Sequence, residues 1–293
     1  MKKALFTAIC LFIGFSMATA QVTLTFNPDK GTKYDYRMEM IQNIKQNVMG
    51  QDMEVKQNMV TLYSMDIIEK SKESVKVKYE YKEVVFELSS MMMNMKYDSK
   101  NPAASTSPVD AAMATLMGSL IGKSFEAVIT PAGKVLSVTG MDEIAAGMVA
   151  AAGDDAQLRA MAEQTKGQYS NEAIKGTLEQ SFGIYPAGKV KVGDSWNVEQ
   201  NIESAGMAID IASVYKLIST DKNNTVMDVE ATVDAMDGQL KGVQNGTISV
   251  ESKTGIITKS ELQQNIKGTV TAQGMDIAMD MNSKILVTTT KAK

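Results

Sequence analysis

The segment Met91 to Met95 has the most unusual chemistry in the chain, because four of its five residues are methionines. Thioether sulfurs are soft ligands suited to Cu(I). Methionine is also a flexible apolar side chain that fills irregular space or lines an adaptable binding surface. The chain has no histidine and one cysteine, so the usual companions of a copper or zinc site are missing. We therefore expect no metal and no cofactor, and we interpret the 23 methionines as core or pocket lining.

Acidic pairs are the other residues that could do chemistry, since two carboxylates can hydrolyse glycosides. The pairs are Asp142-Glu143, Asp154-Asp155 and Asp234 with Asp237. Each falls at an expected helix start or turn, where capping and solvated charge are the ordinary explanation. Without histidine there is also no Ser-His-Asp triad and no Cys-His dyad. The sequence predicts no catalytic residues and no enzyme activity.

The only tryptophan, Trp196, follows a Gly193-Asp194 turn at an expected strand start. Aromatic side chains of this size serve both packing and ligand stacking. We expect Trp196 to anchor the strand in the core, with stacking on a ligand as the alternative.

Apolar residues alternate with polar ones over long stretches, which is typical of half-buried strands. Residues 33–48, with Ile41 as the exception, and residues 53–67 show this pattern. A third stretch, from Val75, changes phase near Lys82 and Glu83, which indicates a β-bulge. Strands of about 14 residues far exceed the usual length and favour a strongly curved sheet.

A helical segment interrupts the strands. Ser107, Pro108 and Asp110 form a helix start with a capping residue, proline at the first position and a carboxylate. Further helical stretches are expected over 142–152, 155–166 and 171–182. The fold class predicted is mainly β (α+β), with about eleven antiparallel strands in a strongly curved sheet or half-barrel. A helical insertion at about 108–182 caps it, and residues 21–293 form a single domain.

Polar residues interrupt the apolar strand faces. They are Gln42, Gln46, Gln57, Thr61, Ser260 and Gln264. In a dry core each would need a buried partner. One explanation is an internal cavity that holds water or an amphipathic ligand; the alternative is that these positions lie at strand ends or beyond the cover of the helices.

The expected ligand-lining residues come from the apolar faces of the strands and of the first helix. They are Tyr34, Tyr36, Met38, Met40, Met59, Tyr63, Met113, Leu116, Met117, Leu120, Met275, Met279 and Met281.

Residues 1–20 have the features of a secretory signal peptide. Lys2 and Lys3 precede an apolar stretch that ends in Ala18-Thr19-Ala20, a cleavage pattern. The apolar stretch is too short to span a membrane. We expect export to the periplasm, the cell surface or the medium. The formal net charge of −4 predicts no nucleic-acid partner.

Three segments carry a resemblance to known proteins: Gly31 to Tyr36, Val190 to Trp196, and Thr254-Gly255-Ile256. They resemble a family of exported bacterial proteins of unknown function, which supplies no catalytic residues. The expected architecture is similar in outline to half-barrel carriers of lipids and lipoproteins in the bacterial envelope. We expect a non-enzymatic carrier or binding protein for a hydrophobic, lipid-like ligand. The alternative is a structural or partner-binding envelope protein with a filled core and no small ligand.

Overall fold

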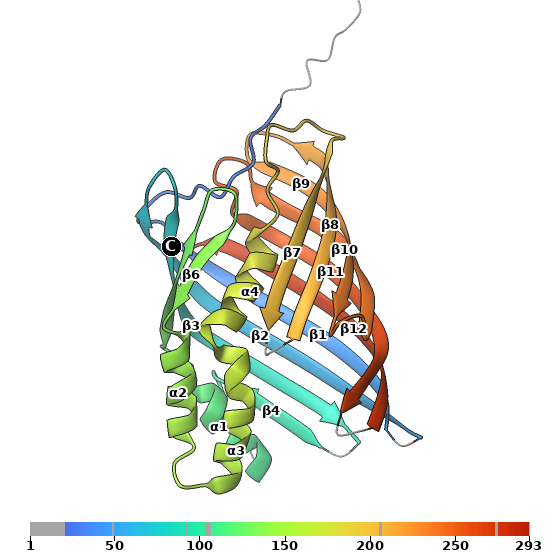
Figure 1. Ribbon diagram of the computed structural model, residues 1–293. Helices are drawn as coiled ribbons and strands as arrows, with labels where there is room; N and C mark the ends of the chain where they lie inside the picture. The colour runs from blue at the N-terminus through green and yellow to red at the C-terminus, as the bar shows by residue number, and fades with distance from the viewer. Residues whose placement is uncertain are drawn as a thin grey trace, which may run out of the picture.

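One antiparallel sheet forms most of the molecule (Figure 1). The computed structural model describes residues 21–48, 50–91, 93–102, 107–204, 207–272 and 275–292. Within these ranges twelve strands pair in a single, strongly curved sheet that does not close on itself. The predicted mainly β fold with a curved antiparallel sheet is confirmed, with one strand more than the approximate count. The expected signal peptide, residues 1–20, lies outside the described residues.

The strands form two consecutive series that meet in the middle of the sheet. The first series is β1 (Lys33–Val48), β2 (Gln51–Lys70), β3 (Val75–Ser90), β4 (Asn94–Asp98), β5 (Ser124–Ile129) and β6 (Val135–Thr139). The second is β7 (Ser195–Ser204), β8 (Met207–Thr220), β9 (Asn224–Ala235), β10 (Leu240–Glu251), β11 (Ile257–Ala272) and β12 (Met275–Lys291). Their order is β6-β5-β3-β2-β1-β12-β11-β10-β9-β8-β7, with β4 paired to β3. The first and last strands therefore pair with each other.

The additional strand is β4, which begins next to the methionine run. Met95 and Tyr97 are buried there, while Asn94 and Lys96 are exposed. The strand is only five residues long, so its alternation is too brief to be distinguished from an apolar loop. The predicted β-bulge in β3 is confirmed. Leu62 pairs with Glu83 and Tyr63 with Tyr81, which leaves Lys82 as the extra residue.

Four helices belong to the segment between β4 and β7. They are α1 (Pro108–Gly118), α2 (Met141–Ala151), α3 (Ala156–Lys166) and α4 (Asn171–Phe182). The predicted start of α1 is confirmed: the Ser107 hydroxyl accepts from the Asp110 N–H, and the Asp110 carboxylate accepts from the Ser107 N–H. None of the helices within the described residues is long and apolar enough to cross a membrane.

Helix α4 lies between the two edge strands of the sheet, β6 and β7 (Figure 1). On the β7 side, the Gln200 amide donates to the Glu179 carbonyl oxygen at 2.5 Å. On the β6 side, the turn at Gly133 is so close that an added Cβ would lie 1.8 Å from the Phe182 carbonyl oxygen. This glycine also has a φ of +82°, which side chains disfavour. Helix α4 thus occupies the gap that strand pairing leaves open.

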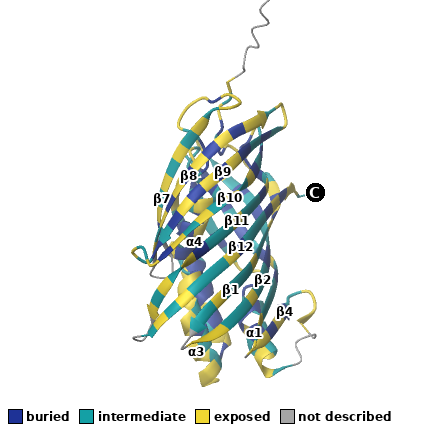
Figure 2. Cartoon of the chain, turned by 90° about the vertical axis from the view of Figure 1, so that its right-hand side faces the viewer, coloured by how far each residue is buried: buried dark blue, intermediate teal, exposed yellow. Residues whose placement is uncertain are grey.

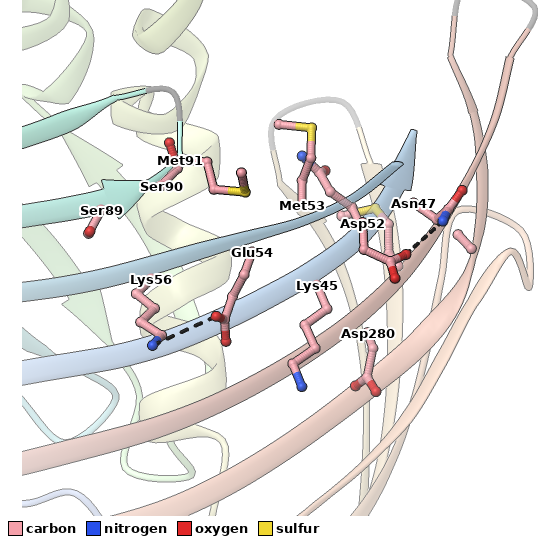
Figure 3. A pocket seen from close by; sticks show the side chains of 13 residues that line it. Lys45, Asn47, Asp52, Met53, Glu54, Lys56, Ser89, Ser90, Met91 and Asp280 are labelled. Atoms are coloured by element: carbon pink, nitrogen blue, oxygen red, sulfur yellow. Dashed lines mark hydrogen bonds and ion pairs between the residues drawn. The ribbon is translucent and has the colours of Figure 1, made fainter. Parts of the chain in front are cut away.

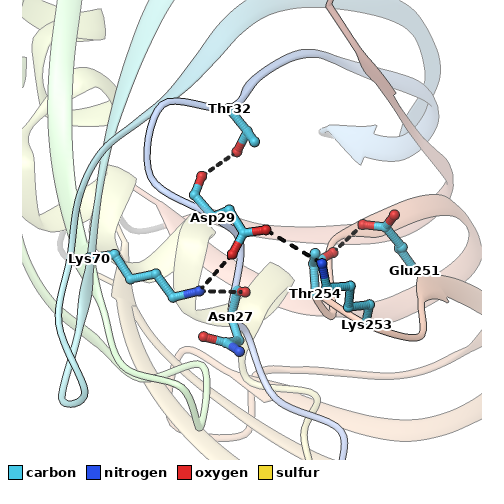
Figure 4. A network of polar contacts seen from close by, with 7 residues as sticks. All are labelled: Asn27, Asp29, Thr32, Lys70, Glu251, Lys253 and Thr254. Atoms are coloured by element: carbon cyan, nitrogen blue, oxygen red, sulfur yellow. Dashed lines mark hydrogen bonds and ion pairs between the residues drawn. The ribbon is translucent and has the colours of Figure 1, made fainter.

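The N-terminal segment 21–32 crosses one end of the sheet and joins turns from distant strands. Its Phe26 N–H donates to the Pro131 carbonyl oxygen at 2.8 Å. The Asp29 carboxylate forms ion pairs with Lys70 Nζ at 3.2 Å and with Lys253 Nζ at 3.7 Å (Figure 4). The hydrogen bond from Lys70 is the main reason that the pKa of Asp29 lies below its usual value. We call this end of the sheet the closed end.

The core near the closed end is rich in tyrosine. Tyr36, Tyr63, Tyr79 and Tyr81 pack with Phe125, and the Tyr79 and Phe125 rings stack at 5.0 Å. Buried residues alternate with half-buried ones along the first half of β3, whereas β2 and β12 carry mostly half-buried and exposed residues (Figure 2). The packed core therefore fills only part of the curve of the sheet.

Candidate ligand-binding face

The inner face of the sheet is the one that meets the helices. Residues paired across neighbouring antiparallel strands point to the same face, so the register assigns each side chain to the inner or the outer face. Tyr36, in the packed core, pairs with Tyr63 and with Thr289. From these pairs, the inner face carries the even-numbered residues of β1 and the odd-numbered residues of β2 and β12.

Burial decreases along the inner face of β1 with distance from the closed end, whereas a second buried cluster, which includes Val233, Leu240 and Ile266, lies at the far end of β7 to β11. In β1, Tyr34 and Tyr36 are 6% and 7% exposed. Met38, Met40 and Ile44 lie on the same face of the same strand but are only half-buried. The helices pack chiefly on the strands near the two edges, β4, β5, β6 and β7. We call the half-buried part of the inner face on β1, β2, β3, β10, β11 and β12 the open face.

The open face is largely apolar. Its half-buried apolar side chains come from β1, β2, β3, β11 and β12: Met38, Met40, Ile44, Val55, Met59, Phe86, Leu88, Leu262, Met279, Met281 and Ile285. Unbranched thioether chains among them can repack around ligands of different shape. This composition is typical of a surface that receives an apolar chain.

A row of polar side chains crosses the open face at right angles to the strands. Gln57 pairs with Gln42, Gln42 with Ser283, Ser283 with Gln264, and Gln264 with Gln244. These five residues, which we call the glutamine row, lie on five neighbouring strands. Ser283 is buried and the four glutamines are half-buried. The Gln42 amide donates to Ser283 Oγ at 3.2 Å, and the Gln264 amide donates to Gln244 Oε1 at 3.4 Å.

Two glycines flank the glutamine row on β10. Gly242 and Gly246 occupy the inner-face positions on either side of Gln244. A Cβ on Gly246 would lie 2.1 Å from the Glu261 carbonyl oxygen of β11, and one on Gly242 would lie 2.3 Å from that of Asn265. Only glycine permits this close approach of the two strands. Because these positions have no side chain, Gln244 has no apolar neighbour next to it on its own strand.

A pocket of about 810 Å³ lies at the ends of β1, β2 and β12 that are farthest from the closed end, and most of its lining residues on these strands belong to the outer face (Figure 3). Met53, Met91 and Met279 contribute its apolar wall. The charged residues around it project from the outer face, among them Glu54 and Lys56, whose charged groups are 3.7 Å apart.

Hydrogen bonds to the outer-face carboxylates near this pocket favour their charged forms. The Asn43 amide donates to Glu54 at 2.8 Å and is the main cause that lowers the pKa of Glu54. The ammonium of Lys267 acts in the same way on the pKa of Asp280, at 2.9 Å. These charged groups therefore lie on the outer face of the sheet, away from the apolar inner face.

The structure separates the expected ligand-lining residues into two groups. Six lie half-buried on the inner face, with Met38 also packed against the core: Met38, Met40, Met59, Met275, Met279 and Met281. The other seven are packed in the core: Tyr34, Tyr36 and the half-buried Tyr63 near the closed end, and Met113, Leu116, Met117 and Leu120 in and just after α1. Met117 Sδ accepts a hydrogen bond from the Tyr169 hydroxyl at 3.7 Å.

Sequence reasoning missed two members of the glutamine row, Ser283 and Gln244. Both lie in strands of the second series, and only the pairing across β12, β11 and β10 places them beside Gln42 and Gln264. The sequence does contain one sign of Ser283: it lies two residues from both Met281 and Ile285, so alternation places it on the same strand face as these apolar residues.

The acidic pairs are used in local structure, as the sequence predicts. Asp155 caps α3 by accepting from the N–H groups of Gln157 and Leu158. Asp142 accepts from the Asn171 amide at 2.5 Å, which links the start of α2 to the start of α4. Asp234 lies 3.5 Å from Lys241 Nζ. Their partners are the helix ends and strand neighbours that ordinary capping and ion pairing require.

The described methionines of the run differ in burial. Met91 and Met93 are 89% and 41% exposed, whereas Met95 is 8% exposed and packs in the core. Met92 lies outside the described residues. Among the residues that the structure describes, no three His, Cys, Asp or Glu side chains are grouped as they would be to hold a metal ion.

Trp196 packs at the start of β7, the place that the sequence predicts. Its ring stacks on Tyr215 of β8 at 5.7 Å and an interplanar angle of 17°. Its Nε1–H donates to the Ile184 carbonyl oxygen at 3.0 Å. Both contacts are with the protein itself.

Comparisons with known proteins give likeness of fold but no activity. A search of curated proteins finds no match. A lipovitellin structure concerned with lipid–protein interactions is 9% identical over 90% of this chain and 26% of its own, with a TM-score of 0.49. The translocator domain of the autotransporter NalP from Neisseria meningitidis is 5% identical over 90% of both chains, with a TM-score of 0.36. An outer membrane channel from Pseudomonas putida F1 is 7% identical over 90% of this chain and 98% of its own, with a TM-score of 0.25.

This chain spans about a quarter of the lipovitellin chain. A family model matches residues 72–257, from within the β2–β3 turn to the first residue of β11. The chain belongs to the family of unknown function DUF6263.

Proposed function

We propose that this protein is a non-enzymatic binding or carrier protein that holds a hydrophobic or amphipathic small molecule on its open face. The observation that supports this most strongly is the change in burial along one face of one strand. Tyr34 and Tyr36 are buried, whereas Met38 and Met40 remain half-buried on the same side. An apolar surface left partly uncovered inside a curved sheet is a usual place for an apolar ligand.

The alternative is a structural or partner-binding protein whose core is filled by its own side chains. The tyrosine-rich core and α1 fit that description, since Tyr79, Tyr81, Leu116 and Leu120 are each at most 1% exposed. The open face fits it less well, because Met38, Met40 and Met59 remain half-buried there. Ligand binding therefore accounts for more of the inner face than a filled core does.

Export is part of the proposal. The charged and apolar residues before Ala20, and the cleavage pattern that ends there, support it. Intact-mass measurement of the protein recovered from the envelope or medium of its host tests it, and a chain beginning at Gln21 is expected. Recovery of the uncleaved chain from the cytosol would contradict the proposal.

Binding can be tested with two neighbouring substitutions on opposite faces of β1. Met40→Arg places a charge on the open face, whereas Ile41→Arg places the same charge on the outer face, where Ile41 is already 43% exposed. The probe is N-phenyl-1-naphthylamine, a neutral dye that fluoresces in apolar surroundings. We expect Met40→Arg to weaken dye binding by at least about tenfold, because an unpaired charge on an apolar surface is costly.

The Ile41→Arg protein is the matched control and should bind the dye as the unmodified protein does. Circular dichroism spectra of both variants should match the parent, so that a loss of binding is not a loss of fold. Equal dye affinities for the two variants, or no dye binding by the parent protein, would contradict the proposal. Native mass spectrometry with lipid extraction, on protein purified from its own host, then identifies the molecule carried.

A further inference from the structure

We infer that the glutamine row binds the uncharged polar linkage of a fatty-acyl ester or amide, whose apolar parts lie on the methionine-rich surface on either side. This inference rests on the proposed function and specifies the chemistry of the ligand. Gln57, Gln42, Ser283, Gln264 and Gln244 lie side by side on β2, β1, β12, β11 and β10. At about 4.8 Å between strands, the row is roughly 19 Å long.

The surface on both sides of the row is apolar. On β1 the neighbouring inner-face residues are Met40 and Ile44, and on β12 they are Ile285 and Met281. Each lies about 6.7 Å from its row member along the strand, since two residues separate them. A ligand that lies along the strands therefore meets an apolar surface, then amide groups, then an apolar surface again. A molecule with a polar linkage next to a long apolar chain matches this order.

The inner face of the five strands carries no charged residue over the described stretches that surround the row. These stretches are 34–46, 53–67, 240–250, 260–270 and 275–289, and all their Lys, Arg, Asp and Glu residues lie on the outer face. A carboxylate or phosphate placed on the row would lose water without gaining a counter-charge. The row therefore selects an uncharged group.

The hydrogen-bonding capacity of the row exceeds what its members use among themselves. Each glutamine amide has two N–H donors and one carbonyl acceptor. The two hydrogen bonds within the row, at 3.2 and 3.4 Å, are longer than the usual 2.9–3.0 Å. Such bonds are weak, and an ester or amide carbonyl that accepts from these N–H groups replaces them at little cost.

The glutamine row has glycine neighbours on β10. Gly242 and Gly246 place no side chain of that strand beside the amides of Gln244 and Gln264, and the backbone of β11 approaches both glycines closely. These amides are the ones that we expect to make the closest contact with the linkage of the ligand.

The test compares three ligands with the same chain length but different polar groups. Methyl laurate carries an uncharged ester, lauric acid carries a carboxylate when ionised, and dodecane carries no polar group. Each is titrated against the bound dye, N-phenyl-1-naphthylamine, in a buffer alkaline enough to ionise the acid. We expect methyl laurate to displace the dye at concentrations at least about tenfold below those of the other two.

Two adjacent glutamines provide matched variants. Gln264→Leu removes an amide from the row, whereas Gln263→Leu removes one from the exposed outer face. In Gln264→Leu, methyl laurate should bind about three- to tenfold more weakly, the range expected for one net hydrogen bond, while dodecane binds as well or better. In Gln263→Leu, all three affinities should be unchanged.

Failure of this inference and failure of the proposed function give different results. If the dye binds, Met40→Arg abolishes binding, and the three ligands compete equally, the binding surface stands and the role of the glutamine row is overturned. Equal effects of Gln264→Leu and Gln263→Leu on methyl laurate also overturn that role. If the dye does not bind at all, the binding function fails and this inference fails with it.

Discussion

The indole Nε1–H of Trp196 donates to the carbonyl oxygen of Ile184 at 3.0 Å, and this bond ties the edge strand β7 to the segment that follows α4. Ile184 is 1% exposed, so its carbonyl group has little access to water. On the opposite edge, Gly133 approaches the Phe182 carbonyl oxygen just before the same segment. The C-terminal end of α4 therefore connects the two edges of an open sheet without strand pairing.

Removal of this bond should destabilise the protein. Trp196→Phe keeps a ring that can stack on Tyr215 but leaves the Ile184 carbonyl oxygen without its donor. We expect the free energy of unfolding to fall by about 1–3 kcal/mol, measured by urea denaturation, because a buried acceptor is left unpaired. Val214→Ala, at a 47% exposed position of β8, is the control and should change it by less than about 0.5 kcal/mol. Equal effects of the two substitutions would show that the bond does not stabilise the edge.

Local features of the fold could be predicted from the sequence because they depend on residues close together in the chain. The cap at Ser107 needs only Asp110, and α4 lies at the predicted positions 171–182. The bulge at Lys82 also appears in the sequence, since an extra residue shifts the phase of the alternation. Strand β4 could not be found this way, because five residues after a methionine run give too little alternation.

The candidate site could be predicted only in part, because it depends on pairing between distant strands. The alternation of β1 and β2 placed Gln42 and Gln57 on an apolar face. The register that brings Ser283 next to Gln42, across 241 positions of sequence, has no local signature. The apolar stripe of α1, by contrast, is predicted from local spacing to be buried, and α1 lies against Tyr97 and Tyr169.

The packing of α1 gives a second prediction. Leu116 is 1% exposed and belongs to the tyrosine-rich core. Leu116→Ala should lower the free energy of unfolding by about 2–5 kcal/mol, since it leaves a cavity, and should leave dye affinity unchanged. Val109→Ala, at a 36% exposed position of the same helix, is the control, with an expected change below about 0.5 kcal/mol. Loosened dye binding in Leu116→Ala would instead indicate that α1 covers the ligand.

A third prediction concerns the methionine run. Met91 and Met93 are exposed, whereas Met95 is buried in the core. Addition of Cu(I) should therefore leave the melting temperature unchanged, because a ligand stabilises only by preferring the native state. A rise that depends on copper, and that is lost when Met91, Met92, Met93 and Met95 are all replaced by Leu, would contradict this prediction and establish a thioether copper site.

The last prediction concerns the stability of the tyrosine-rich core in alkali. Burial raises the pKa of Tyr169 to about 12, against about 10 in an unfolded chain. Below about pH 10 both states are protonated and the stability contribution is complete. Between about pH 10 and 12 the unfolded chain releases the proton first, so the free energy of unfolding falls by about 1.4 kcal/mol per pH unit for this residue. Burial raises the pKa of Tyr63, Tyr79 and Tyr81 as well, which steepens the fall.

Tyr169→Phe isolates the contribution of one residue, because lysines and other tyrosines titrate in the same range in both proteins. Urea denaturation of the parent and the variant at several pH values from 8 to 11, as an experimental series, gives the two slopes. Above about pH 10 the slope of the variant should be shallower by about 1.4 kcal/mol per pH unit, and below it the two slopes should agree. Parallel curves over the whole series would mean that the Tyr169 hydroxyl titrates as it does in water, and that the core around it is not closed.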